Sequence, residues 1–557
     1  MSTSAGVVID GYDVLAETGR YRFADRVLGG RRLNRGTAMV APGGTPHADA
    51  GEAQRRYAQQ VVPSTLTPAS PVVDLSYPVA GLFVDSPAGV YLDLYQGVAQ
   101  RLFDDQHPRL RGIIEQLAGY GLAFRREIAT DDVLELGRPL GDLRAPRELA
   151  ALVNGLTSAA FPGLGACRTF FSNSGAEAGE AAIKLAQLHC YRRLVARHGP
   201  ALVERLMADL GIPRDRVFDG DPSPPDDPLY ADYPFVIIGC DGAFHGRTLG
   251  VLNLTRSRKA QQLAFSKLRW RRHVPFNGRL QDLADLLDRR PLPEILSSPG
   301  GASAVFAAGK VPVELAALFA VECYQGEGGY RLADRGWLRA IAALCKEHGI
   351  LLGLDEVQSF GRTGALYAGE RYGIVPDLVW IAKAAVVGMT VVRAELADEA
   401  HVGWHSNTFG GGKLFDVNLS YAVIDTLVNW KEPLFEGRGY LENSRLKGEY
   451  LRMRLAELCA QHADVFPEFS GLGGMWGLTV RHRDEVIATA WREGAKLLGC
   501  GRRGTRSRLR LILLTDVLTR EIDQMVAVLE RTLAAVSAAH ADDPPFGEED
   551  DEEEPPA

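Results

Sequence analysis

The chain has 557 residues, of which 46% are hydrophobic, values that fit an ordinary globular protein of roughly two or three domains. Its formal net charge of −8 is unevenly spread, because residues 542–554 contain nine acidic residues and no basic one. The rest of the chain is close to neutral and lacks the concentrated basic charge that nucleic-acid binding requires. We therefore expect no nucleic-acid partner, and we expect residues 541–557 to form a disordered acidic tail.

Cysteine usage and the start of the chain exclude further classes of protein. The seven cysteines are widely spaced and form neither a CxxC pair nor a zinc-binding pattern, so we expect no disulfide scaffold and no metal site. The first residues show no basic segment followed by an apolar core, and no apolar run reaches the length of about 18 residues that a membrane span needs. These patterns predict a cytoplasmic protein without a membrane partner.

The order of apolar runs along the chain predicts the fold class. Residues 1–77 mix short apolar runs with Gly- and Pro-rich loops, and we can assign this N-terminal extension no role. From about 80 to 535, strand-like runs alternate with helical patterns, which is typical of a mostly parallel α/β sheet. One helix is expected where apolar residues recur at helical spacing before a glycine that ends it: Leu338, Ile341, Leu344, Cys345 and Gly349.

Five predicted strands, at 168–171, 235–238, 318–321, 350–354 and 378–382, are each followed by small or polar residues. Open α/β sheets bind ligands at the carboxyl ends of their strands, so these residues are candidates for one site. After the first strand comes a loop of small residues, Ser174-Gly175-Ala176, that leads into an Ala-rich helix. Such a loop lets a phosphate approach the free N–H groups of the helix, although a capped and closely packed helix would have the same sequence.

The second and third strands are followed by an aromatic ring and by charged groups. Phe244 could stack on a planar ring, and Arg247 could bind a carboxylate through two hydrogen bonds. Glu322 ends an apolar run, and Glu327 follows in a Gly-rich loop. A carboxylate in such a place needs a partner, so both could orient cofactor or substrate groups, or cap the next element.

The fourth and fifth strands end in the two most informative residues. Asp355 interrupts an apolar run where a buried charge needs a cation, and a protonated pyridine nitrogen would be one. Lys383 ends a buried strand, where desolvation lowers its pKa and frees the amine for imine formation. A phosphate site, a stacking ring, a counter-charge for a ring nitrogen and a Schiff-base lysine are together what pyridoxal phosphate requires.

The chain resembles the class III aminotransferases, which have the aspartate-aminotransferase-like fold (fold type I), and among them the ornithine and acetylornithine enzymes. The matching segments cover about 80 to 535 in the family's order: NSGAEAGEAAIKLA, DGAFHGRTLG, VECYQGEGGY, HGILLGLDEVQSFGRTGALYAGERYGIVPDLVWIAKA and SNTFGGG. The resemblance implies a homodimer with shared active sites that moves an amino group from an amine or a basic or ω-amino acid to a 2-oxo acid such as 2-oxoglutarate. The domains it implies are 78–140 as the N-terminal part of a small domain, 141–430 as the large domain with an insertion at about 196–233, and 431–540 as the C-terminal small domain.

The resemblance also implies roles for the cofactor residues. Lys383 would hold the cofactor and shuttle the proton, and Asp355 would keep the pyridine nitrogen protonated. Gln358 would bond the phenolic oxygen, and Phe244 would stack on the ring. Thr408 would reach the phosphate of the neighbouring subunit's cofactor. The remaining cofactor-binding residues are Gly175 and Ala176, with backbone N–H groups on the phosphate, together with Ser174, His245 and Glu322.

Three further residues match substrate positions of the family. Arg247 matches an arginine for a substrate carboxylate, and Arg510 matches the arginine for the α-carboxylate of the second substrate. A glutamate placed like Glu327 can pair with that arginine and swing aside. The chain departs from the family mainly around the substrate, at Val98, Asp104-Asp105, Cys323, Gly412-Lys413, Ser470-Gly471 and Leu513-Leu514.

The sequence leaves three alternatives to a transaminase open. A racemase, aminomutase or decarboxylase would share the cofactor residues on the same fold. A non-catalytic homologue that binds a partner would fit the altered substrate loops and the acidic tail, although such a protein has no need for Lys383. A dinucleotide-binding enzyme ranks last, because the loop at Ser174 lacks the GxGxxG spacing.

Overall fold

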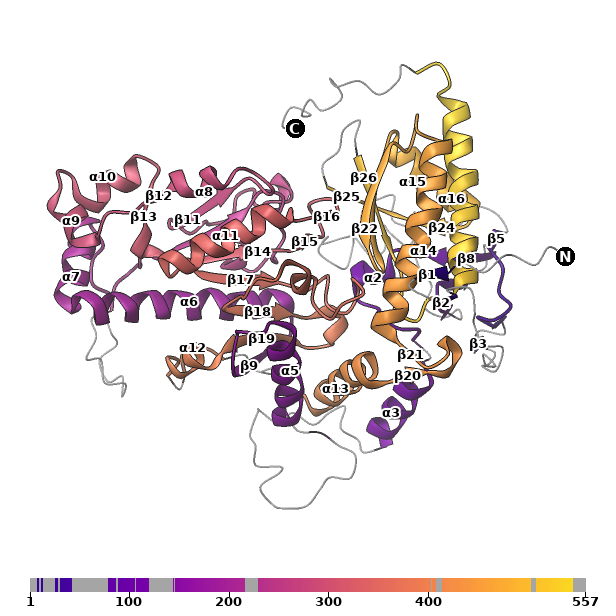
Figure 1. The fold of residues 1–557 in the computed structure, drawn as a ribbon, viewed down its shortest axis with the longest axis horizontal. Helices are drawn as coiled ribbons and strands as arrows, with labels where there is room; N and C mark the ends of the chain where they lie inside the picture. The colour runs from indigo at the N-terminus through magenta and orange to yellow at the C-terminus, as the bar shows by residue number, and fades with distance from the viewer. Residues whose placement is uncertain are drawn as a thin grey trace.

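The structure is a computed structural model of the chain (Figure 1). It describes residues 8–9, 12–13, 26–28, 31–42, 79–86, 89–105, 107–119, 144, 146–215, 229–401, 403–406, 413–501 and 507–543. Thr408, the loop at 219–228 and residues 544–557 lie outside the described residues.

A seven-stranded sheet forms the centre of the larger part of the molecule. Its order is β11-β10-β14-β17-β18-β19-β9, and all neighbours are parallel except β19, which is antiparallel to both of its neighbours. The sheet confirms the predicted α/β fold, and all five predicted strands are present. The strands are β9 (Cys167–Ser172), β10 (Val236–Cys240), β11 (Arg271–Val274), β14 (Ala316–Val321), β17 (Leu351–Asp355), β18 (Leu378–Ile381) and β19 (Gly388–Arg393).

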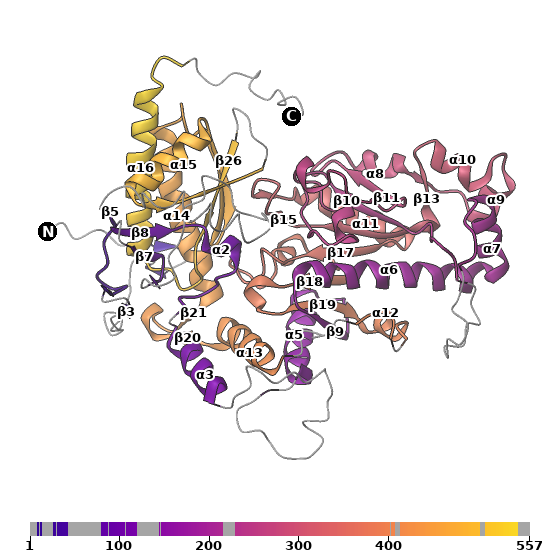
Figure 2. The same ribbon diagram turned by 180° about the vertical axis from the view of Figure 1, so that it is seen from behind.

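Helices cover both faces of this sheet, and this explains why its strands are continuous apolar runs. Every residue of β10, β14, β17 and β18 is buried. Figures 1 and 2 show α6 (Gly175–His198) along one face, with α8 (Leu280–Leu286) and α11 (Arg335–His348) on the other. Helix α11 is the helix predicted from periodicity, and it ends at Gly349, whose φ of 66° is left-handed.

A second, smaller sheet lies in the C-terminal part of the chain. It is antiparallel throughout, in the order β22-β23-β26-β25, and is accompanied by α14, α15 and α16. Three N-terminal strands and β24 form another sheet beside it, in the order β24-β8-β7-β6, with β5 paired to β8. These elements are β5 (Ala41–Pro42), β6 (Val79–Ala80), β7 (Phe83–Ser86), β8 (Gly89–Asp93), α14 (Tyr440–Gln461), β22 (Glu468–Leu472), β23 (Met475–Val480), α15 (Arg483–Glu493), β24 (Ala495–Lys496), β25 (Leu498–Cys500), β26 (Ser507–Ile512) and α16 (Thr519–Ala539).

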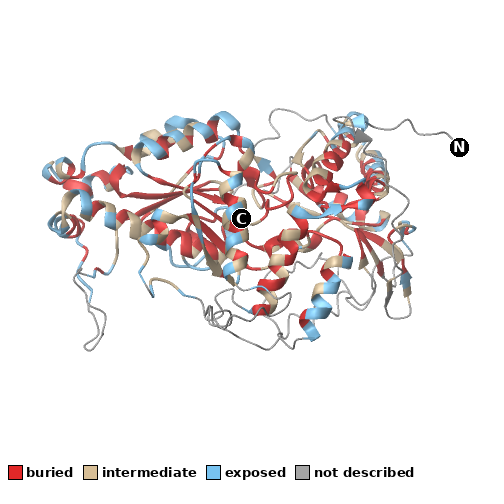
Figure 3. Ribbon diagram, turned by 60° about the horizontal axis from the view of Figure 1, so that its bottom comes forward, coloured by how far each residue is buried: buried red, intermediate tan, exposed pale blue. Residues whose placement is uncertain are grey.

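The apolar core is divided in the same way. One cluster of buried residues surrounds the seven-stranded sheet, and a second joins the N-terminal strands to the C-terminal helices, with Phe83 and Leu92 packed in the same cluster as Leu511 and Ile522. Figure 3 shows the buried residues along the central strands and along the inner faces of the C-terminal helices. The two ends of the chain therefore build one smaller unit together.

The remaining elements are short strands, loops with 3-10 turns, and covering helices. They are β1 (Val8–Ile9), β2 (Tyr12–Asp13), β3 (Arg26–Leu28), β4 (Arg31–Leu33), α2 (Gln96–Ala99), α3 (Pro108–Gly119), α5 (Pro146–Ala160), α7 (Pro200–Asp209), η2 (Val251–Asn253), η3 (Lys259–Gln261), β12 (Leu287–Asp288), α9 (Leu292–Ser297), α10 (Gly301–Ala307), β13 (Val311–Pro312), η4 (Val313–Leu315), β15 (Tyr324–Gln325), β16 (Arg331–Leu332), η5 (Ala368–Tyr372), η6 (Lys383–Ala385), α12 (Ala394–Asp398), α13 (Leu414–Asn429), β20 (Lys431–Glu432), η7 (Pro433–Phe435) and β21 (Arg438–Gly439). Helix α7 lies in the expected insertion and buries Val203, Leu206 and Met207 in the main core. Among the described helices, none combines the length and the apolar character that crossing a bilayer requires.

A buried arginine from the N-terminal extension holds the smaller unit together. The guanidinium of Arg35 lies 2.9 Å from Asp516 and 2.9 Å from Glu521, with Asp104 at 3.7 Å. All four side chains are almost fully buried. Asp104 is one of the departures from the family pattern, and its burial beside Arg35 explains it: the extension supplies the cation that this carboxylate needs.

We predict that Arg35→Ala destabilises the protein by about 3–5 kcal/mol, because it leaves buried carboxylates without their cation. The free energy of unfolding, measured by urea denaturation, tests this. Arg452→Ala serves as the control, because Arg452 is 54% exposed in its ion pair with Glu449 and should cost no more than about 1 kcal/mol. Equal effects of the two substitutions would show that the Arg35 network does not stabilise the fold.

Candidate active site

The pairing of β17 with β18 brings two of the predicted residues to one edge of the sheet. The strands are parallel, with Asp355 opposite Trp380, and the N–H of Glu356 donates to the carbonyl of Trp380 at 2.9 Å. Lys383 lies one residue beyond the end of β18, after Ala382, and has a φ of 49°. A lysine in the left-handed region is strained by about 1–3 kcal/mol, and such strain is concentrated at functional sites.

The amine of Lys383 is prepared to react as a nucleophile. Burial lowers its pKa to about 8, against the pull of Glu327, while the positive charges of Arg510 and Arg362 lower it further and Asp355 raises it. Near pH 8 about half of the molecules therefore carry a neutral amine at this position. The same interactions show that Lys383 lies within electrostatic reach of both Asp355 and Glu327.

Asp355 is buried and is oriented from both sides. Its Oδ2 lies 2.7 Å from Nδ1 of His245, and its Oδ1 accepts the N–H of Val357 at 3.0 Å. Burial alone would lower the pKa of His245, but the hydrogen bond and the charge of Asp355 outweigh it, and the pKa is raised. His245 thus contacts the aspartate, which makes it a residue that orients Asp355.

Glu322 fixes two backbone segments beside the ring position. It accepts the N–H of Phe244 at 2.9 Å and the N–H of Gly326 at 3.0 Å. Burial raises its pKa to about 7, while His245 lowers it and Asp355 raises it. Through these bonds Glu322 holds Phe244 and the Gly-rich loop at Gly326.

The start of α6 lies against two loops, one that contains Val357 and one that contains Gly246. The hydroxyl of Ser174 caps the helix by accepting the N–H of Glu177 at 3.2 Å, so Ser174 acts on the helix itself. A side chain on Gly175 would come within 2.8 Å of Val357, and one on Gly246 would come within 2.7 Å of Ala176. Glycine is required at both positions for the three loops to meet. The first backbone N–H groups of an α-helix have no carbonyl acceptor within the helix. The N–H groups of Gly175 and Ala176 are therefore suited to bind an anion.

Tyr330, at the end of the Gly-rich loop, connects Gln358 with Arg510. Tyr330 is fully buried, its hydroxyl donates to Gln358 at 3.4 Å, and its ring lies 5.6 Å from the guanidinium of Arg510. Gln358 packs against Gly326, where any side chain would overlap it. The motif VECYQGEGGY ends in Tyr330, but sequence reasoning assigned it no role.

Arg510 and Glu327 form an ion pair at 2.8 Å, with the Arg510 side chain 1% exposed. Burial alone would raise the pKa of Glu327, but the charge of Arg510 and their hydrogen bond lower it. The other oxygen of Glu327 lies 3.9 Å from Arg258, a half-exposed residue. Glu327 therefore has a second cation toward which it could turn.

The structure thus joins most of the predicted residues in one network of contacts, which includes the Asp355 and Glu327 that act on Lys383, with two exceptions. Arg247 is exposed and lies with its guanidinium 5.8 Å from the centre of the Phe244 ring. Thr408 lies outside the described residues. No pattern in the sequence pointed to Arg362 or Trp380. Both are fully buried, and neither ends a strand in the pattern that drew attention to Lys383.

These residues fit pyridoxal phosphate. An anion cradle at α6, a ring site between Phe244 and the 355–358 loop, and the buried Asp355 and Lys383 each match one part of the cofactor. Buried polar atoms without hydrogen-bond partners among the described residues, Nε2 of His245 and Nε1 of Trp380, lie in the same region. When bound, the cofactor supplies an electron-accepting ring that stabilises negative charge on the substrate carbon. The fold and site define a fold-type-I pyridoxal-phosphate enzyme.

The comparison with known proteins gives the family. The aminotransferase class-III family matches residues 79–533, so the chain belongs to it. An acetylornithine aminotransferase of Thermosynechococcus vestitus is 31% identical over 382 residues, 67% of this chain and 76% of that protein. One from Bacillus cereus is 28% identical over 457 residues, covering 81% and 92%.

Solved structures agree with this assignment. The lysine aminotransferase from M. tuberculosis is 25% identical, with a TM-score of 0.62 over 88% of this chain and 100% of that one. The ornithine aminotransferase from Toxoplasma gondii ME49, at 19% identity and a TM-score of 0.61 over 88% and 96%, shares the fold. The protein is accordingly a pyridoxal-phosphate-dependent aminotransferase that uses an amino donor and a 2-oxo acid.

We predict that reductive methylation of Lys383 in the cofactor-free protein accelerates about tenfold per pH unit below pH 8 and levels off above it. The reason is that only the neutral amine reacts and its pKa is lowered to about 8. An ordinary lysine, for which free Nα-acetyl-lysine is the reference, continues to gain toward about pH 10. Peptide mass spectrometry measures the rate, with Lys383→Arg as the blank, and a profile like that of the free amino acid would contradict the prediction.

Proposed function

We propose that the protein transfers an amino group from the terminal amine of an ω-amino or basic amino acid to 2-oxoglutarate or a similar 2-oxo acid. The observation that carries this proposal is the buried Glu327–Arg510 ion pair beside Lys383. While the pair is closed, Arg510 is not available to a donor's α-carboxylate. A donor that presents a distant amine, with its carboxylate elsewhere, is then favoured.

The second half of the reaction needs the pair to open. A 2-oxo acid brings a carboxylate next to its reacting carbon, and Arg510 can bind that carboxylate through two parallel hydrogen bonds. Glu327 must then turn away, and Arg258 at 3.9 Å offers it a new partner in a more exposed position. One site could thus serve two substrates of different shape in turn.

The other residues have the following proposed roles. Lys383 takes the proton from the substrate carbon and later gives it up again. Its lowered pKa permits both uptake and release of a proton near neutral pH. Asp355, oriented by His245, holds a proton on the ring nitrogen of the cofactor. Gly175 and Ala176 bind the phosphate through their N–H groups, and Gln358 and Phe244 position the ring. Arg247, exposed at the rim, binds a donor carboxylate.

A donor panel tests the proposal. With 2-oxoglutarate as acceptor, ornithine, acetylornithine, lysine and 4-aminobutyrate should include the best donors, measured as glutamate formed. Glu327→Ala should raise kcat/KM for 2-amino acids such as glutamate at least tenfold relative to the best ω-amine donor, because Arg510 is then permanently free. Glu327→Gln, which keeps the shape but removes the charge, should show a smaller change in the same direction. Isomerisation of an amino acid without any oxo acid would instead identify a racemase or aminomutase.

We also propose that the protein is a homodimer in which Thr408 reaches the phosphate site of the partner. In mixed dimers of Lys383→Ala and Thr408→Ala, one of the two sites contains both intact residues. We predict that refolding the two variants together yields more activity, at limiting cofactor, than the sum of the variants kept apart. Sedimentation velocity provides the oligomeric state, and a purely additive activity in confirmed mixed dimers would show that each subunit works alone.

Two further expectations remain proposals. The division into an extension, a large domain at 141–430 and a small domain from 78–140 and 431–540 is supported in its main lines by the two apolar cores, but Leu102, Phe103 and Leu110 pack in the larger core. A cytoplasmic location is supported by the seven cysteines, all of which are free thiols.

A further inference from the structure

Tyr95, to which no pattern in the sequence assigned a role, is attached through the backbone to the strand that carries Arg510. It follows Leu94, which bridges two strands of the smaller unit. The N–H of Leu94 donates to the carbonyl of Lys496 on β24 at 3.2 Å, and its carbonyl accepts the N–H of Ile512 on β26 at 3.1 Å. Ile512 lies two residues beyond Arg510 on the same strand. These bonds place Tyr95 close to the arginine.

The chain turns sharply after Tyr95, and an arginine near the active site holds this turn. Residues 96–99 all have left-handed φ values, between 50° and 62°, although only Gly97 adopts them readily. Such strain persists only where the surroundings impose it, and it is concentrated at functional sites. Arg362 donates hydrogen bonds to the carbonyls of Ala99 and Arg101, and its charge also lowers the pKa of Lys383. The turn that orients Tyr95 is therefore tied to the active site.

The charges of the Glu327–Arg510 ion pair act on the hydroxyl of Tyr95. Burial raises the pKa of this hydroxyl, Arg510 lowers it, and Asp93 and Glu327 raise it. Among the described residues, the hydroxyl has no hydrogen-bond partner.

Arg510 also has an unused donor. Its Nε is buried and has no hydrogen-bond partner within the part of the chain that the structure describes, and Glu327 contacts only Nη1 at 2.8 Å. A carboxylate has two oxygens that can each accept more than one hydrogen bond. A phenol and a guanidinium with unused donors near one another are therefore suited to bind one carboxylate together.

A lysine lies over the ring of Tyr95. Lys496 is opposite Asp93 in the parallel pair of β24 and β8, and its Nζ lies 4.8 Å from the centre of the tyrosine ring. This distance is that of a cation–π interaction. Burial lowers the pKa of Lys496, and Asp93 raises it. Lys496 forms no ion pair with any described residue, so the face of the ring is the group that its ammonium contacts.

We propose that Tyr95 is a specificity-determining residue for the 2-oxo acid. When Glu327 leaves Arg510, the hydroxyl of Tyr95 donates a hydrogen bond to the carboxylate that Arg510 binds. Lys496 is a positioning residue that holds the tyrosine ring in place. This proposal rests on the function proposed above, because it takes Arg510 as the group that binds the carboxylate next to the reacting carbon.

Steady-state kinetics of the holoenzyme with 2-oxoglutarate test the proposal. We predict that Tyr95→Phe lowers kcat/KM for 2-oxoglutarate by about 10- to 100-fold, mainly through KM, because a hydrogen bond to a charged group is lost. The donor half-reaction should keep its wild-type rate. It is followed by the absorbance of the bound cofactor after the best donor is added without any oxo acid. Unchanged KM for 2-oxoglutarate in Tyr95→Phe would overturn the proposal.

Two further sets of variants separate positioning from a general loss of structure. Lys496→Met should raise KM for 2-oxoglutarate about 3- to 10-fold, and Lys496→Arg, which keeps the cation, should restore the wild-type value. Tyr91→Phe is the matched control. Tyr91 lies on β8 with its ring 4.7 Å from that of Trp491, and burial alone acts on its pKa, so its substitution should leave KM unchanged.

The Glu327→Ala background distinguishes a contact with the carboxylate from an effect on the ion pair. If Tyr95 contacts the carboxylate, Tyr95→Phe raises KM for 2-oxoglutarate by the same factor in this background. Loss of the effect there would show that Tyr95 acts only on Glu327, and the proposal would be wrong.

Failure of the proposed function has a different signature. A wild-type enzyme that uses no ω-amine donor would refute that function, but binding of glutarate, an unreactive dicarboxylate, still tests Tyr95. Calorimetry should then show at least tenfold weaker glutarate binding by Tyr95→Phe than by the wild type. Glutarate that binds both proteins equally, or neither, would overturn the role of Tyr95.

Discussion

The parallel register of β17 and β18 is the constraint on which the active site depends. It sets Asp355 opposite Trp380 and therefore brings the carboxylate and Lys383, three residues after Trp380, to the same edge of the sheet. Because β17 and β18 are buried on both faces, neither can slip without exposing apolar residues or burying polar ones. The packing of this sheet thus holds two ionisable groups out of water. The same packing maintains the left-handed backbone at Lys383.

Charge is balanced locally within this edge. Asp355 is paired with His245, and Glu327 is paired with Arg510, each at hydrogen-bonding distance. Lys383 interacts with the charges of both pairs. Burial nevertheless has the largest effect on its pKa, because the neighbouring charges act in opposite directions. If the Glu327–Arg510 pair opens as we propose, the charge near Lys383 would change at the same time as Arg510 becomes free to bind a carboxylate.

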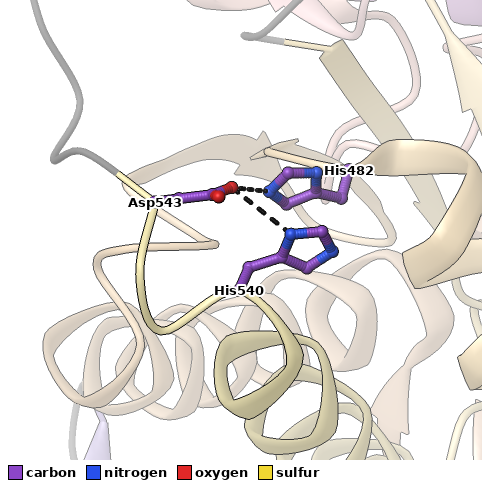
Figure 4. Close-up of side chains that lie close together, drawn as sticks. All are labelled: His482, His540 and Asp543. Atoms are coloured by element: carbon purple, nitrogen blue, oxygen red, sulfur yellow. Dashed lines mark ion pairs between the residues drawn. The ribbon is translucent and has the colours of Figure 1, made fainter.

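The N-terminal extension and the last helix, α16, contribute charged contacts to the smaller unit. Arg35 supplies a cation to three carboxylates from two distant segments, and the Asp-Asp at 104–105 is explained in part by it. At the opposite end of α16, His540 meets His482 and Asp543, the latter in a turn within the segment expected to be a disordered tail (Figure 4). Helix α16 is therefore fixed near its start by Arg35 and at its end by the contacts of His540. The resemblance to the family assigns no role to either residue.

The sequence alone determined the α/β class, the five strands and the placement of Asp355 and Lys383 after two of them. These features are local: apolar runs, a helical period and a polar residue at the end of a strand are all read from neighbouring positions. It could not decide that Ser174 caps its own helix, that His245 binds Asp355, that Tyr330 links Gln358 to Arg510, or that Arg247 lies at the surface over Phe244. Arg35 and the cluster of His482, His540 and Asp543 join segments that are far apart along the chain, so no local sequence pattern predicts their contacts. Only the tertiary structure decided these contacts, because a side chain's partner depends on which distant segments the packed cores bring beside it.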